Sequence, residues 1–215
     1  MLKLSLDNDS PKKILCLGAH CDDIEIGVGG TILKLVRTIK NPDVCWVVFS
    51  SDDRRARETE KSANDFLRNV KRKKILINRF RNSYFPYHGE EIKEYFEKLK
   101  GEYQPDIIFT HYRNDLHQDH RLISELTWNS FRDHLILEYE IPKFDGDLGS
   151  PNFFVHLVAD LCRMKTNRIM KYFKSQNDKK WFTSDTFLSL LRIRGVESNA
   201  PDKYAEGFYC RKIIL

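Results

Sequence analysis

The chain has 215 residues, a formal net charge of +5 and a hydrophobic fraction of 41%. This composition suits one globular domain with a sizeable core, excludes a disordered chain, and includes no apolar run of the ~20 residues that a membrane helix needs. The N-terminal segment 1–13 lacks the apolar core of a signal peptide, and five scattered cysteines form no CxxC pair, so we expect a cytoplasmic protein. We predict one domain over residues 1–215.

The first two thirds of the chain alternate short apolar runs with segments of helical periodicity. The apolar runs predict strands at 13–18, 44–50, 73–77 and 106–110. Apolar residues at helical spacing predict helices at 24–40, 54–70, 90–102 and 120–133. Strands that are apolar on both faces and alternate with helices are typical of a parallel sheet covered by helices.

The pattern changes after about residue 135. Two apolar segments close together, 135–141 and 152–158, predict antiparallel or edge strands. A mixed helical region follows at 159–195, and 207–215 predicts a last strand. We therefore predict an α/β fold: a single Rossmann-like domain with a mostly parallel sheet flanked by helices, and with antiparallel or edge strands in its C-terminal part.

Polar clusters follow two of the predicted strands directly. The stretch "GAHCDDIEIGVGG" begins at the end of strand 13–18, and "HYRNDLHQDH" follows strand 106–110. In open α/β sheets, ligands bind beyond the carboxyl ends of the strands. We therefore expect the two clusters to be neighbours in the folded chain.

Together the two clusters hold the residue types of a catalytic metal site. His20, Asp23 and His120 could provide two imidazoles and one carboxylate, a set that suits zinc or ferrous iron and leaves a position open for water. Asp22, next to a ligand, would then be free to accept a proton from the metal-bound water as a general base.

Other residues of the second cluster could assist. His117 could polarise a substrate oxygen or protonate a leaving group, and Asp119 could orient His117 or a ligand histidine. The simpler alternative is that Asp22, Asp23 and Asp119 only cap or precede helices, which does not explain why both clusters contain histidine. The remaining histidines have no such company and are interpreted as ordinary surface or core residues: His88, His134 and His156.

These motifs resemble those of the LmbE-like (PIG-L) family of metal-dependent deacetylases. "AHCDDIEIGVGGTI" is similar to the family's AHPDD-E---GG motif, and "HQDH" to its HxDH motif. "RARETEKSANDFL", "PDIIFTHYRNDLHQDH", "KSQNDKKWF" and "IRGVESNAPDKYAEGFY" resemble further family elements in the same order. The resemblance extends over roughly residues 13–210.

The resemblance implies a function and assigns roles. It implies His20, Asp23 and His120 as zinc ligands, Asp22 as the general base, and His117 as the group that stabilises the oxyanion or acts as an acid. Family members remove N-acyl groups, usually acetyl, from amino sugars and related glycoconjugates. The implied partner is thus a small-molecule amino sugar, free or nucleotide-linked; a homo-oligomer is compatible with this, and a ferrous ion is the alternative to zinc.

The resemblance is less specific at other positions. It places Asp119 beside His117 as part of the catalytic set, and it matches Asp115 and Arg57 to polar positions near the site. Cys21 stands where the family usually has proline, a residue that would fix the shape of the loop. A thiol at this place could compete as a metal ligand.

Two other classes of function compete with a hydrolase. A ferrous oxygenase could use the same ligands, but that chemistry usually occurs on a β-sandwich. A non-enzymatic or degenerate metal- or ligand-binding module could use the basic segment 68–81 to bind an acidic partner. The same segment is explained by a solvated helix end that runs into a strand, or by a basic rim that attracts a phosphorylated substrate. We expect no nucleic-acid partner.

Overall fold

The computed structural model describes residues 12–214 of the chain. Most of the N-terminal segment considered for a signal peptide, and the last residue of the final predicted strand, lie outside this range. One mixed sheet has seven strands in the order β3-β2-β1-β4-β5-β7-β6. In chain order these are β1 (Lys13–Gly18), β2 (Asp43–Val48), β3 (Arg72–Ile77), β4 (Ile107–His111), β5 (Leu135–Tyr139), β6 (Phe153–Leu157) and β7 (Tyr204–Cys210).

The prediction of a mostly parallel sheet with an antiparallel C-terminal part is confirmed. β1 pairs in parallel with β2 and β4, and β3 and β5 extend this parallel part on either side. β7 lies antiparallel between β5 and β6. The predicted last strand differs, since β7 begins three residues earlier than 207 and ends at Cys210. Beyond it, the side chains of Arg211 and Lys212 lie against the ring of Trp128 instead of continuing the sheet.

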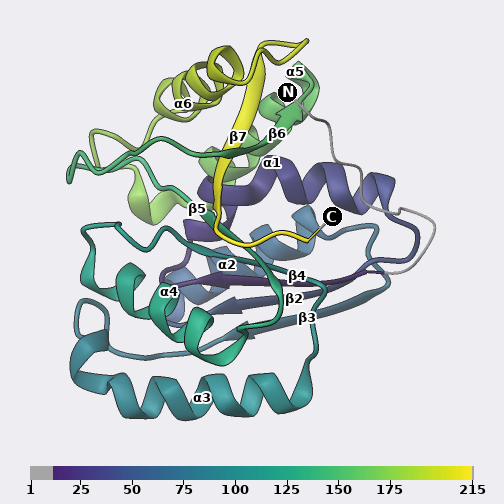
Figure 1. Cartoon of the computed structure of the whole chain (residues 1–215). Coiled ribbons are helices and arrows are strands. Elements are labelled where there is room, and N and C mark those ends of the chain that lie inside the picture. The colour runs from purple at the N-terminus through teal and green to yellow at the C-terminus, as the bar shows by residue number, and fades with distance from the viewer. Residues whose placement is uncertain (1–11, 215) are drawn as a thin grey trace.

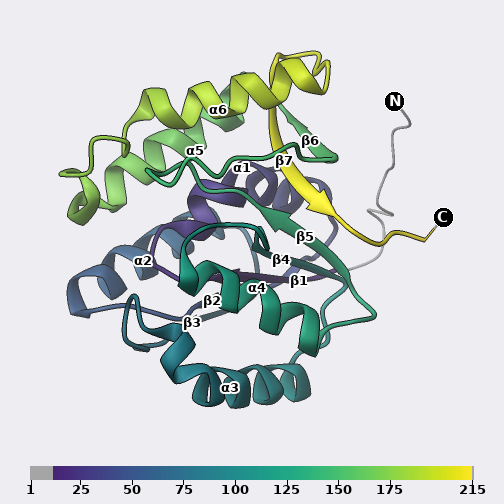
Figure 2. The same ribbon diagram turned by 60° about the vertical axis from the view of Figure 1, so that its left-hand side comes forward.

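Helices cover both faces of the sheet (Figures 1 and 2). They are α1 (Asp23–Thr38), α2 (Asp53–Phe66), α3 (Gly89–Glu102), α4 (Gln118–Ser130), α5 (Ala159–Tyr172) and α6 (Ser184–Glu197), with short 3₁₀ turns at η1 (Phe85–His88) and η2 (Lys174–Gln176). α3 and α4 pack on one face, and α1, α2, α5 and α6 share a core on the other. Among the described residues, no helix combines the length and apolar character needed to cross a membrane.

α1 is held unusually close to the sheet and to the C-terminal strand. A Cβ atom on Gly27 would lie 2.1 Å from the ring of Tyr139, and one on Gly30 would lie 2.4 Å from Leu157. The carboxylate of Glu206 in β7 accepts hydrogen bonds from the backbone N–H groups of Gly30 and Thr31. The glycines therefore allow α1 to pack closely on the sheet. This packing fixes the position of the first residues of α1, which follow the end of β1.

Candidate metal centre

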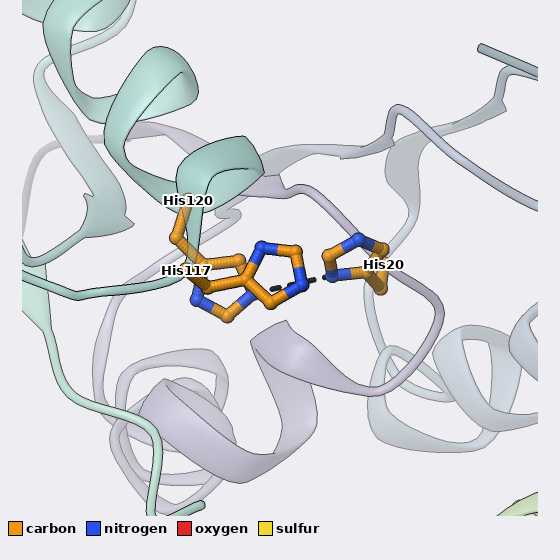
Figure 3. A group of neighbouring side chains, drawn as sticks. All are labelled: His20, His117 and His120. Atoms are coloured by element: carbon orange, nitrogen blue, oxygen red, sulfur yellow. Dashed lines mark hydrogen bonds between the residues drawn. The ribbon is translucent and has the colours of Figure 1, made fainter. Parts of the chain in front are cut away.

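The two polar clusters predicted at strand ends do meet. β1 and β4 are parallel neighbours, so the loops that follow them start at the same edge of the sheet. His20 comes from the loop after β1, and His117 and His120 come from the start of α4; their rings point toward one another (Figure 3). Asp23, the first residue of α1, joins them from the side of β1.

Three side-chain atoms form a compact triangle, which we call the ligand triangle: His20 Nδ1, Asp23 Oδ2 and His120 Nε2. The two nitrogens are 3.1 Å apart. The carboxylate oxygen lies 3.4 Å from the His20 nitrogen and 3.6 Å from the His120 nitrogen. All three residues are buried, and two imidazoles with a carboxylate match the donors of catalytic zinc and ferrous sites.

A carboxylate holds the outer nitrogen of each histidine in the triangle. His20 Nε2 lies 3.1 Å from Asp119 Oδ2, and His120 Nδ1 lies 2.9 Å from Asp115 Oδ2. When the outer nitrogens donate to these carboxylates, both inner nitrogens direct lone pairs into the triangle. In the metal-free protein a proton shared between the two inner nitrogens accounts for their 3.1 Å separation, and a metal cation could take the place of that proton.

The electrostatics of the triangle favour one positive charge. Burial opposes the charged form of His20, but hydrogen bonds to Asp119 and Asp23 raise its pKa to about 9. Burial also opposes the charged form of Asp23, but His120 and His111 hold its pKa well below the usual carboxyl range. Burial and the neighbouring His111 lower the pKa of His120 to about 3. Asp23 is thus a carboxylate and His120 a neutral base, as metal ligands must be, whereas His20 carries a proton that a bound metal would displace.

Two other histidines lie close enough to the triangle to count as possible ligands, and one nitrogen of each is engaged in a hydrogen bond, while Nδ1 of His111 has no partner among the described residues. His111 Nε2 accepts the backbone N–H of Ala19 at 2.9 Å and lies 3.2 Å from the hydroxyl of Tyr139. His117 Nδ1 accepts the backbone N–H of Asp119 at 3.2 Å. This leaves the proton of neutral His117 on Nε2, where it can be donated to a substrate.

Asp22 is adjacent to the triangle and has a different environment. It occupies the N-cap position of α1, yet its side chain makes no capping hydrogen bond. Its Oδ1 instead accepts a hydrogen bond from Arg55 at 2.8 Å, and the side chain is buried. Burial raises the pKa of Asp22, and Arg55 opposes this shift. A helix cap therefore does not account for this carboxylate.

Asp119 also has a role other than a cap. The side chain that caps α4 is that of His117. The two oxygens of Asp119 accept the backbone N–H groups of Ser83 at 2.7 Å and Phe85 at 3.2 Å, while one of them contacts His20. We predicted that Asp119 orients either His117 or a ligand histidine. The structure shows its side chain in contact with His20, a histidine of the ligand triangle.

The largely buried side chain of Lys143 contacts Asp115. Lys143 Nζ lies 3.0 Å from the oxygen of Asp115 that contacts His120, and it also forms an ion pair with Asp147. Asp147 in turn accepts the backbone N–H of Leu116 at 2.7 Å. The loop after β5 is therefore fastened to the segment that carries His120. The sequence offered no signal for Lys143.

The arginine at the site is Arg55, whereas Arg57 lies exposed on the same helix. Arg55 is in line with the buried face of α2, which includes Thr59, Ser62 and Phe66. Spacings of four, seven and eleven residues follow the helical period. From this periodicity the sequence could have predicted that Arg55, rather than Arg57, faces the site.

Cys21 points away from the ligand triangle. Its thiol donates to the carbonyl of Ser50 at 3.3 Å, and it is buried. Burial raises the pKa of this thiol to about 12, so it stays protonated. The side chain therefore acts as packing beside the loop.

Comparisons with known proteins identify the family and the fold. The family model PIG-L, described as GlcNAc-PI de-N-acetylase, matches residues 15–131. The N,N'-diacetylchitobiose deacetylase of Pyrococcus horikoshii has a similar structure, with a TM-score of 0.69 and 25% identity over 93% of this chain and 84% of that one. A deacetylase of teicoplanin biosynthesis superposes with a TM-score of 0.71 at 14% identity, covering 92% of this chain and 97% of that one.

The fold is also shared with a protein of other chemistry. The 4-carboxy-2-hydroxymuconate hydratase of Pseudomonas putida has a TM-score of 0.73 and 13% identity, covering 95% of this chain and 98% of that chain. Similarity at this level shows the fold alone. A conclusion on activity must therefore come from the site.

Proposed function

The chain belongs to the PIG-L family, and from this premise we propose that it is a metal-dependent hydrolase that removes an N-acetyl group from an amino sugar or an amino-sugar conjugate. The observation that carries this proposal is the ligand triangle, with its three atoms 3.1 to 3.6 Å apart, beside a buried carboxylate that neither caps a helix nor belongs to the triangle.

A divalent metal, with zinc as the first candidate and ferrous iron as the second, would be held by His20, Asp23 and His120. When bound, it supplies a Lewis acid that polarises the acyl carbonyl and lowers the pKa of water. Asp119 and Asp115 contact the outer nitrogens of the two imidazoles, so the inner nitrogens would be free to bind a metal once His20 has lost its extra proton. This orientation supports the fit of the site to a cation.

Asp22 is the proposed general base. Arg55 holds its Oδ1, so the other oxygen remains to accept the proton of the attacking water. The water oxygen bonds to the acyl carbon, and the C–N bond then breaks. Asp22 returns the proton to the leaving nitrogen, and the products are acetate and a free amine.

His117 is the proposed donor to the oxygen of the tetrahedral intermediate. Burial and the neighbouring His20 lower its pKa, so it is neutral near pH 7. Its Nδ1 is engaged by the helix start, and its Nε2–H is available. A neutral donor fixed in this way stabilises developing negative charge without giving up its proton.

The substrate class rests on similarity and chemistry together. The structurally similar Pyrococcus protein is a deacetylase of N,N'-diacetylchitobiose, which supports an N-acetylated amino sugar. The intact ligand triangle argues against a degenerate binding module. The cysteines are free thiols, four of them buried, which supports the proposed cytoplasmic location.

Acetate release tests the proposal. The purified chain would be stripped with a chelator, reloaded with zinc or ferrous iron, and given N-acetylglucosamine, N,N'-diacetylchitobiose or nucleotide-linked N-acetylglucosamine. We expect acetate and new primary amine in equal amounts, and only from metal-loaded protein. Metal-loaded protein that releases no acetate from any of these compounds, or metal-free protein that remains fully active, would contradict it.

A further inference from the structure

We propose that the loop from Arg81 to Tyr87, after β3, forms a carbohydrate subsite. It would bind an uncharged sugar ring that is linked to the N-acetyl amino sugar being cleaved. This inference rests on the proposed function, and it names the substrate class as an oligosaccharide or other glycoside rather than a single free sugar.

The loop is fastened directly to the metal centre. The backbone N–H groups of Ser83 and Phe85 both donate to Asp119, the carboxylate that holds His20. The ring of Phe85 is fully buried and stacks near His20, with ring centroids 6.0 Å apart. Ser83 has a φ of 65°, a left-handed conformation that residues other than glycine rarely adopt. The loop is therefore held in a defined shape at the edge of the site.

On either side of the buried Phe85, the loop exposes two aromatic rings. Tyr84 is 40% exposed and Tyr87 is 79% exposed, and their ring centroids lie 5.9 Å apart. Pro86 between them restricts the backbone. Because Tyr87 is two residues from Phe85, its Cα lies within about 8 Å of the Cα of Phe85, at ~3.8 Å per peptide unit. The backbone that carries the exposed rings is thus continuous with Phe85, whose ring packs near His20.

A cation completes this surface. The guanidinium of Arg81 lies 3.6 Å from the centroid of the Tyr84 ring, and no carboxylate among residues 12–214 forms an ion pair with Arg81. Its N–H donors and the tyrosine hydroxyls can bind sugar hydroxyls, while the rings offer apolar area. Tyrosine supplies such contacts with little loss of conformational entropy. The two rings are tilted by 51° to one another and Arg81 lies over Tyr84, so a sugar ring would stack on Tyr87 with the donors of Tyr84 and Arg81 beside it.

The charges nearby favour a neutral ring over a nucleotide. Arg79, two residues earlier, pairs with Asp53, and Lys74 pairs with Glu102. Arg81 is thus the one cation that the loop 81–87 presents. A diphosphate is typically bound by several charge-assisted hydrogen bonds, more than the single Arg81 of this loop offers, whereas a neutral glycosidic neighbour does not need them.

Binding to the full-length, metal-loaded chain tests the subsite. The ligands are N,N'-diacetylchitobiose, N-acetylglucosamine and nucleotide-linked N-acetylglucosamine, measured by calorimetry in an Asp22→Asn background that slows turnover. The test variant carries Tyr84→Ala and Tyr87→Ala, and the matched control carries Tyr84→Phe and Tyr87→Phe. We expect the alanine pair to weaken disaccharide binding about 5- to 30-fold and monosaccharide binding less than about twofold, as two lost ring contacts would. The phenylalanine pair should keep most of the affinity.

Several outcomes would overturn the subsite. One is unchanged disaccharide affinity in the alanine pair, and another is an equal loss for both sugars. A loss confined to nucleotide-linked N-acetylglucosamine would show a nucleotide subsite instead. An unchanged melting temperature checks that the exposed positions do not disturb the fold. Acetate release is measured separately on otherwise wild-type protein, so specific binding without any acetate release would contradict the proposed function and leave the subsite standing.

Discussion

Asp22 and Asp23 are neighbours in sequence, but their carboxylates have separate environments. Asp23 faces two histidines that lower its pKa, while burial raises the pKa of Asp22 against the charge of Arg55. Carboxylates whose pKa values are pushed apart in this way are typical of sites that divide binding and proton transfer between two acids. The separation supports a ligand role for Asp23 and a base role for Asp22.

Substitution of Cys21 tests whether its thiol is a metal ligand. Because its thiol binds the carbonyl of Ser50 and stays protonated, we expect Cys21→Ala to keep a full equivalent of metal. The lost contact should lower the free energy of unfolding by only ~1 kcal/mol. Metal content and thermal melting measure both effects. A variant that folds but binds no metal would show that the thiol is a ligand.

The proximity of the histidines could be predicted from the sequence, whereas the contacts of the residues around them could not. His20 and His120 could be brought together because each follows a strand of a parallel sheet. His111 begins the second cluster at the very end of β4, yet no pattern said that it would accept the N–H of Ala19. Lys143 reaches Asp115 from a loop, and loop paths depend on tertiary contacts that periodicity does not contain.

The basic segment 68–81 follows the end of α2 and continues into the edge strand β3. β3 is an edge strand, and its first residues are exposed lysine and arginine. Charged side chains on an edge strand prevent pairing with another chain. Several of these cations also have acidic partners: Arg68 pairs with Asp65, Lys74 with Glu102 and Arg79 with Asp53. This supports the interpretation of the segment as a solvated helix end and strand.

The loop after β5 provides a second test. Lys143 joins Asp115, which holds His120, to Asp147. Removing its charge by Lys143→Met should loosen the support of His120 and weaken metal binding about 10- to 100-fold, as loss of groups behind metal ligands typically does. A chelator competition measures this affinity. Lys98→Met, which removes a 73% exposed lysine, is the matched control and should bind metal like the wild type.

Unchanged metal affinity in a folded Lys143→Met protein would show that the lysine only fastens the loop. Equal losses in both lysine variants would point to a general effect of net charge. Only a loss specific to Lys143 assigns it to the support of the metal centre.

The C-terminal part of the chain holds in place the helix α1, which begins with Asp23. Glu206 of β7 accepts the N–H groups of Gly30 and Thr31, and it pairs with Lys165 of α5 at 2.6 Å. Lys165 also donates to the carbonyl of Ile26. α1, which begins with Asp23, is thus supported by strands and helices that follow residue 150, beyond the segment 15–131 matched by the family model.

This buried pair leads to a prediction for stability. Glu206→Gln leaves the buried ammonium of Lys165 without its counter-charge, which typically costs about 3–5 kcal/mol of unfolding free energy. Denaturant unfolding measures the change. Glu102→Gln removes the carboxylate of an exposed pair with Lys74 and should leave the free energy of unfolding almost unchanged, because solvent screens such pairs. A Glu206→Gln protein as stable as the Glu102→Gln control would mean that the buried pair does not support α1.

The sheet shows where prediction from sequence ends. Apolar runs on both faces identified β1, β2 and β4 as buried strands, and their alternation with helices identified β1 to β4 as parallel. The exposure of β3 at the edge of the sheet was not identified. The placement of β7 between β5 and β6 did not follow from its own residues. Pairing order in an antiparallel part depends on which strands the helices bring together, and α5 and α6 separate β6 from β7 along the chain.

The most direct test of the central proposal compares two variants of adjacent residues, Asp22→Asn and Asp23→Asn, each assayed for metal content and for acetate release on the same preparation. We expect Asp23→Asn to lose metal and activity together. Asp22→Asn should keep about one metal per chain while kcat falls about 10²- to 10⁴-fold with little change in KM, as loss of a general base predicts. Full activity in Asp22→Asn would contradict the mechanism, and loss of its metal would mean that the roles of the two carboxylates are exchanged.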